Sequence, residues 1–187
     1  MSAEDVTLKS VIEGLWVAPG NAEWTPKTDV LPLSDVKRWM ESDDIEVLGF
    51  TDAMIHDGRF RIEPPLEVED YVRWVKHYFG RCFRENPDGE WSDSSYSAGW
   101  DLVRVFIKLW DDASVPRELL LELKVWIAEL YKNADDRLRT CIVNAALEHL
   151  FERKPIRKYF LDWGNDPILS TAYNEAGFWD GKTPLSR

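Results

Sequence analysis

The stretch DGEWSDSSYSAGWDL, residues 88–102, places acids, serines and tryptophans at spacings that could form a site. A calcium loop needs oxygen ligands at alternate positions around a central glycine and a closing glutamate. Here the glycine comes second and no glutamate closes the loop. The G-x-S-x-G turn of serine hydrolases is also absent from the sequence. We therefore expect a turn, a helix cap and the first turns of a buried helix, with Trp91 as the one candidate contact.

The histidines offer one further chemical alternative. His56, His77 and His149 do not form HxH, HExxH or another spacing that would bring several ligands to one metal. Glu148 and Glu152 share a predicted helix face beside His149, which would suit a metal-dependent hydrolase. A di-metal bundle would need a second Glu-x-x-His pair, and the sequence has none. We expect no catalytic residues, no metal and no cofactor, and we keep the hydrolase as an alternative.

The charge of the chain excludes some partners. The net charge is −11, and the first 70 residues hold 16 acidic against 6 basic residues. Residues 41–70 alone hold ten acids and two arginines. An acidic surface repels nucleic acids and anionic membranes and attracts basic proteins. A basic cluster in ERKPIRKYF, residues 152–160, is expected to lie at a helix end rather than on a nucleic acid. A solvated helix surface is the alternative explanation for the acids.

Cysteine usage and hydropathy predict a cytoplasmic protein. Cys82 and Cys141 are far apart and match neither CxxC nor a zinc-ligand spacing. The first residues, MSAEDVTLKS, are acidic where a signal peptide would be basic, and no apolar run approaches the ~20 residues of a membrane span. We expect a soluble, cytoplasmic protein.

The part of the chain after residue 70 predicts a series of amphipathic helices. Apolar residues recur at helical spacing over residues 71–86, from Ser92 or Ser94 to Trp110, over 117–133 and over 135–151, and shorter helices are expected near 155–163 and 166–177. Short connections force neighbouring helices to run antiparallel. The predicted fold class is all-α, built from antiparallel helical hairpins as a bundle or a short HEAT-like stack.

The first 70 residues predict shorter elements. Helical spacing occurs in VTLKSVIEGLW, LSDVKRWMES and DIEVLGFTDAMI, whereas APGNAEWTPKTDVLP is rich in helix breakers and RFRIEP could be extended or a short strand. No linker is long enough to separate this part. We therefore expect a single domain over 1–187, with an irregular, acidic, loop-rich part at 1–70 and a helical core at 71–180.

A candidate partner-binding surface combines the acidic segment with nearby aromatic residues. Interfaces often centre on aromatic anchors ringed by charges, and an acidic rim captures a basic protein quickly. Burial of the same aromatics is the competing explanation. The predicted contact residues are Asp43, Asp44, Glu46, Asp57, Glu67, Glu69, Asp70, Trp39, Phe60 and Trp91.

Three stretches of the chain resemble a group of uncharacterised bacterial helical proteins. They are DGRFRIEPPLEVEDYVRWVKHYF, DGEWSDSSYSAGWDL and LEHLFERKPIRKYFLDW, and the resemblance extends over about residues 45 to 180. In size, acidity and helical make-up the chain is also similar to immunity proteins that neutralise polymorphic bacterial toxins. This second resemblance is one of general character, so it carries over no functional residues.

These observations lead to one main hypothesis and two alternatives. The main hypothesis is a non-enzymatic inhibitor, an immunity protein whose acidic residues pair with a basic toxin, such as a nuclease, and occlude it. A helical scaffold or adaptor is the first alternative, and it would bind through the helices after residue 93. The metal-dependent hydrolase with Glu148, His149 and Glu152 is the second.

Overall fold

A computed structural model of the chain describes residues 6–17 and 25–177. The chain is predominantly α-helical, as the sequence predicts. Its contacts group into two compact units: unit 1 is Met1–Trp74 with Pro87–Asp93, and unit 2 is Val75–Asn86 with Ser94–Arg187. The boundary lies within one long helix, near the residue where the acidic third ends. Among the described residues, none of the helices combines the length and apolar character that a bilayer span requires.

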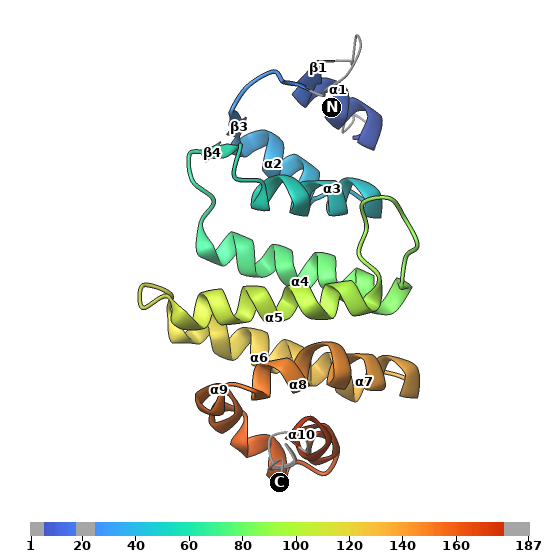
Figure 1. Cartoon of the computed structure of the whole chain (residues 1–187), viewed down its shortest axis with the longest axis vertical. Helices are drawn as coiled ribbons and strands as arrows, with labels where there is room; N and C mark the ends of the chain where they lie inside the picture. The colour runs from blue at the N-terminus through green and yellow to red at the C-terminus, as the bar shows by residue number, and fades with distance from the viewer. Residues whose placement is uncertain (1–5, 18–24, 178–187) are drawn as a thin grey trace, which may run out of the picture. The chain divides into compact units, whose positions relative to one another are not determined.

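Unit 1 contains short helices joined by short strands (Figure 1). The elements are α1 (Leu8–Leu15), β1 (Trp16–Val17), β2 (Thr25–Pro26), β3 (Val30–Pro32), α2 (Leu33–Met40), α3 (Ile45–His56), β4 (Arg61–Glu63) and the beginning of α4 (Val68–Glu85). β1 pairs antiparallel with β2, and β3 pairs parallel with β4 so that Leu31 lies opposite Ile62. The predicted helices are confirmed, and RFRIEP contains a strand. Residues 18–24 of the predicted loop lie outside the described residues.

The core of unit 1 forms where α1, α2 and α3 place apolar side chains at helical spacing. Thr7 begins α1 with a capping box, in which its hydroxyl and the Ser10 side chain each accept the other's backbone N–H. This cap satisfies backbone donors at a short helix that buries only Val11 and Leu15. The fully or largely buried members of the core are Val11, Leu15, Trp16, Leu31, Val36, Trp39, Val47, Phe50 and Met54.

Unit 2 contains the rest of α4 and the helices that follow. These are α5 (Ser95–Asp111), α6 (Arg117–Lys132), α7 (Asp136–Ile142), the π-helical η1 (Val143–Leu147), α8 (Glu148–Phe151), α9 (Lys154–Tyr159), the 3₁₀-helical η2 (Leu161–Asn165) and α10 (Leu169–Gly177). Ser94 caps α5 by accepting a hydrogen bond from the Ser97 N–H at 3.2 Å. The predicted caps and helices are therefore confirmed, although a π segment interrupts the predicted helix 135–151.

The helices α5 and α6 and the run from α7 to α8 reverse direction in turn, and α5 lies beside both α6 and this run (Figure 1). Gly99 of α5 lies directly against Ala145 of η1. A Cβ atom at Gly99 would lie 2.5 Å from the Ala145 Cβ and 3.2 Å from the Ala145 backbone carbonyl. The missing side chain of Gly99 lets these two helices come so near, since a Cβ atom at this position would overlap the Ala145 Cβ and press against the Ala145 backbone.

We predict that Gly99→Ala destabilises unit 2 by about 1–3 kcal/mol, because the added methyl group must push α5 away from η1. Gly164→Ala is the matched control, since its Cβ would meet the Tyr173 ring at an ordinary distance of 3.8 Å. The control is expected to change stability by less than about 1 kcal/mol. Urea unfolding followed by far-UV circular dichroism measures both variants, and equal midpoints for the two would contradict the close approach.

Candidate functional site

The loop before α5, residues 87–93, is held against α3 by one carboxylate. We call this loop the acidic loop, because PDGEWSD carries three acids in seven residues. Glu46, in the first turn of α3, accepts hydrogen bonds from the backbone N–H groups of Glu90 at 2.8 Å, Trp91 at 3.0 Å and Ser92 at 3.1 Å. Burial opposes ionisation, but the neighbouring Ser92 hydroxyl and these backbone donors outweigh it and lower the pKa of Glu46.

Two glycines allow the acidic loop to lie directly on α3. A Cβ atom at Gly49 would lie 2.5 Å from the Trp91 carbonyl carbon and 2.8 Å from the Ser92 Cα. A Cβ atom at Gly89 would overlap the Glu46 carboxylate. The loop backbone therefore reaches Glu46 only because both positions lack a side chain. Trp91 is fixed in place as a result.

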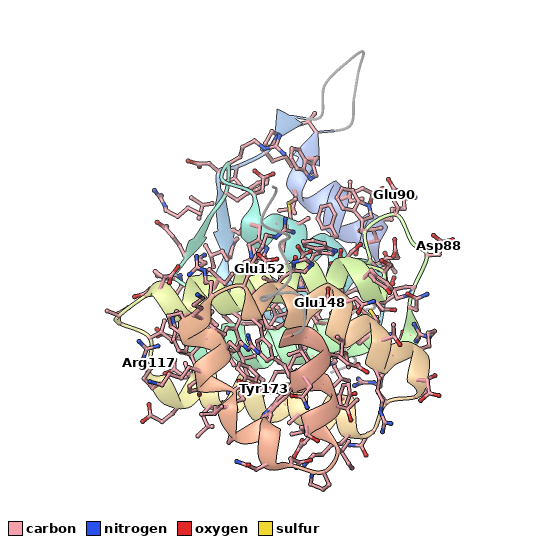
Figure 2. All side chains as sticks on the ribbon, turned by 60° about the horizontal axis from the view of Figure 1, so that its bottom comes forward. Asp88, Glu90, Arg117, Glu148, Glu152 and Tyr173 are labelled. Atoms are coloured by element: carbon pink, nitrogen blue, oxygen red, sulfur yellow. The ribbon has the colours of Figure 1, made fainter. Side chains whose placement is uncertain are left out.

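An apolar groove with a volume of about 430 Å³ lies between α1, α3 and the acidic loop. Figure 2 shows Glu90 on this loop, with α1 (blue) beside it. A groove of this size and composition suits apolar side chains of a ligand. The residues that line it are Leu8, Ile12, Trp16, Phe50, Ala53, Met54, Asp57, Arg59, Glu90 and Trp91.

Aromatic contacts set the walls of the groove. The Trp91 ring stands edge-on to Phe50, with centroids 4.8 Å apart and an interplanar angle of 78°. At the other end of α3, the Arg59 guanidinium lies over the Trp16 ring, 5.0 Å from its centroid. Arg59 also forms a bidentate ion pair with Asp57. The hydrogen bonds from Arg59 lower the pKa of Asp57. The groove thus has a neutralised pair at one end and the acidic loop at the other.

The three predicted aromatic anchors differ in exposure. Trp39 is only 4% exposed and belongs to the core of unit 1, so its expected exposure is wrong. It is buried because α2 presents it, together with Val36, towards the core. Phe60 is half-buried and packs edge-on against Trp16 at 5.5 Å. Trp91 is half-buried and lines the groove, so it alone of the three is placed to contact a ligand there.

Asp44, Glu46, Asp57 and Asp70 have structural partners within unit 1. Asp44 caps α3 by accepting the Glu46 N–H at 2.9 Å, and Glu46 holds the acidic loop. Asp57 pairs with Arg59. Asp70 pairs with Lys37 at 2.7 Å and with Arg73 at 2.9 Å, and the hydrogen bond from Lys37 lowers the pKa of Asp70.

The other three predicted acids lie on the surface. Asp43 is exposed in the connection between α2 and α3. Glu67 and Glu69 are exposed at the start of α4, and neither forms an ion pair with a described residue. The sequence could not distinguish Glu67 and Glu69 from the acids that have internal partners, because those partners are distant in sequence or belong to the backbone.

The basic side chains in the described part of unit 1 are all engaged internally. Most pair with a carboxylate, and Lys27 donates to the Glu13 carbonyl. The residues concerned are Lys9, Lys27, Lys37, Arg38, Arg59, Arg61 and Arg73.

Several exposed acids of unit 1 therefore have no basic partner among the described residues. We call them the uncompensated carboxylates. Four of them, Asp29, Glu41, Asp88 and Glu90, are absent from the predicted set, and of these four Asp88 and Glu90 project from the acidic loop (Figure 2). Their position after a helix-ending proline marks an exposed loop, which is the sequence signal that would have found them. The uncompensated carboxylates are Asp29, Glu41, Glu67, Glu69, Asp88 and Glu90.

The alternative metal site in unit 2 does not assemble. His149 pairs with Glu152 at 3.0 Å and stacks on the Trp100 ring, with centroids 4.0 Å apart. Glu148 and Glu152 lie on the same helical run (Figure 2), but the ligand atoms of Glu148, His149 and Glu152 do not all three lie within 4.8 Å of one another. Elsewhere in unit 2, burial raises the pKa of the Cys141 thiol to about 11, so this thiol is not activated.

We predict that Glu46→Gln lowers the free energy of unfolding of unit 1 by about 1–3 kcal/mol at pH 7, because the backbone N–H donors lose a charged acceptor. The pKa of Glu46 is lowered in the folded state, so its stabilisation is present above the unfolded value of 4.5 and is lost as the pH falls through the folded value. The difference between parent and variant should therefore shrink below pH 4.5. Denaturant unfolding of the parent and of Glu46→Gln, at pH 7 and below pH 4.5, measures this difference in the free energy of unfolding.

The control for this experiment is Glu41→Gln, which removes an exposed charge of unit 1 that forms no ion pair with a described residue. This variant is expected to match the parent at each pH. If Glu46→Gln also matched the parent at pH 7, the acidic loop would not depend on Glu46.

We compared the chain with models of known protein families, with curated proteins and with solved structures, and none of the three comparisons gives a significant match.

Proposed function

We propose that this protein binds a basic protein partner through unit 1 and neutralises it by occlusion, as an immunity protein does with a bacterial toxin. The observation that carries the proposal is the set of uncompensated carboxylates. An exposed carboxylate that lacks an internal partner loses little on binding an external Lys or Arg, since no existing ion pair must be broken. Such groups increase the rate at which a basic partner is captured.

The distribution of charge supports unit 1 as the binding unit. Unit 1 contains 19 acidic against 7 basic residues, whereas unit 2 contains 15 against 16. The field of unit 1 is therefore strongly negative, and unit 2 is close to neutral. A negative field repels phosphate groups, so the proposed partner is a protein rather than a nucleic acid or a membrane. We place the interaction in the cytoplasm, where two free, buried cysteines stay reduced.

A second candidate function, a scaffold or adaptor, is favoured by exposed apolar side chains in unit 2. Tyr96 and Trp100 lie one turn apart on α5 and are each 50% exposed. Leu121 and Val125 show the same spacing on α6, at 51% and 48% exposure. Pairs one turn apart on a helix can anchor a peptide. The two candidate functions thus place the binding surface on different units.

We predict that reversing the uncompensated carboxylates slows association with the partner. The partner is first captured at low salt on the immobilised protein and then purified. Two double variants are measured by surface plasmon resonance: Glu67→Lys with Glu69→Lys, and Asp88→Lys with Glu90→Lys. Loss of electrostatic steering should lower the association rate constant at low salt by roughly 10-fold or more for the pair that faces the partner.

The matched control is Glu118→Lys with Glu129→Lys, which makes the same charge change at exposed positions of α6 in unit 2 that form no ion pair with a described residue. Binding through unit 1 predicts a smaller loss for this control than for at least one unit 1 pair. If the control slowed association as much as both unit 1 pairs, only overall charge would matter. If Tyr96→Ala with Trp100→Ala abolished binding instead, the scaffold function would replace the inhibitor.

A further inference from the structure

We infer that the groove between α1, α3 and the acidic loop seats a basic amphipathic helix of the partner. This inference rests on the proposed function and assigns the contact within it. The helix would place two apolar side chains, one turn apart, into the groove and direct a Lys or Arg towards Glu90.

The dimensions of the groove match a pair of helical anchors. From Phe50 to the end of α3 at His56, next to Asp57, its α3 wall covers nearly two turns of helix, about 9 Å. Side chains three or four residues apart on a helix lie roughly 5–6 Å apart, so two of them fit along this wall. The volume of about 430 Å³ leaves room for both.

The walls are apolar and held in place before any ligand arrives. Leu8 and Ile12 on α1 and Ala53 on α3 are half-buried, so each still offers apolar surface to a ligand. Trp91 forms the third wall, and its position is set by the bond between its backbone N–H and Glu46. Met54 in the floor can adapt its shape to different anchors. A preformed groove lowers the entropic cost of binding.

The two ends of the groove differ in charge, which gives the bound helix a direction. Glu90, at the end where α3 begins, is exposed and has no ion pair with a described residue. At the other end Asp57 is already neutralised by Arg59. A cation of the partner therefore gains a new ion pair only at the Glu90 end. The occupant is thus an amphipathic segment with Lys or Arg beside one anchor.

The test uses a synthetic helical peptide of about four turns, roughly 14 residues, with two leucines one turn apart and flanking lysines. Its binding to the full-length protein is measured by fluorescence anisotropy of a label on the peptide. A scrambled peptide of the same composition controls for net charge. We expect the amphipathic peptide to bind at least ~10-fold more tightly than the scrambled one, since only it can bury both leucines. Equal affinities would overturn the inference.

Two variants locate the contact. Ala53→Trp fills the groove and should weaken peptide binding by about 10-fold or more, whereas Ala53→Ser leaves the groove open and should bind like the parent. Leu8→Arg places a charge in the opposite wall of the groove and should also weaken peptide binding. This variant tests the inference if Ala53→Trp does not fold. Far-UV circular dichroism and the Tm of each variant establish folding. Folded Leu8→Arg or Ala53→Trp protein that binds the peptide as the parent does would contradict the inference.

The same variants separate this inference from the proposed function. One outcome is that the captured partner binds Ala53→Trp as it binds the parent and yet associates slowly with a charge-reversed unit 1 variant. In that case the groove is not the contact, and the inhibitor proposal stands. If the groove variants bind the peptide weakly but bind the partner as the parent does, the groove binds the peptide and is not the partner's binding site. The inference is then wrong. If the groove variants and the charge-reversed variants both lose partner binding, this result supports the groove inference and the inhibitor proposal together.

Discussion

The bond between one carboxylate and three backbone N–H groups organises unit 1. Glu46 reaches from the first turn of α3 to the acidic loop, more than forty residues later in the sequence. A buried backbone donor is costly when unpaired, and a charged acceptor satisfies it strongly. The loop can approach only because Gly49 and Gly89 have no side chains. The position of Trp91, and with it one wall of the groove, follows from this contact.

The same internal bonding determines which charges face the solvent. Lysines and arginines in the described part of unit 1 are occupied by internal acceptors, so the surplus of acids appears as exposed carboxylates with no basic partner among the described residues. One of these carboxylates, Glu90, lies at the rim of an apolar groove, and Asp88 belongs to the same loop. An apolar centre with a charged rim is the arrangement by which protein interfaces combine affinity with fast association. This combination is why we favour binding by unit 1 over a scaffold based on α5 and α6.

The helices could be predicted from the sequence, whereas the site could be predicted only in part. Helical periodicity and the Ser94 cap depend on local spacing, so the elements from α4 to α10 lie close to their predicted positions. Exposure depends on contacts between distant residues, so Trp39 was expected on the surface and lies in the core. The roles of Glu46 and Asp70 likewise depend on partners that are not adjacent in sequence. Asp88 and Glu90 were missed because the acidic segment was defined by composition rather than by its neighbours in space.

Amide hydrogen exchange of the protein, alone and bound to the captured basic partner, tests the central claim most directly. It reports which backbone segments become protected, without any substitution that could disturb folding. Binding through the groove predicts that protection appears in Leu8–Leu15, in the second half of Ile45–His56 and in residues 87–93. Protection confined to Ser95–Asp111 and Arg117–Lys132, with these segments of unit 1 unchanged, would contradict the account and would support a scaffold that binds through unit 2.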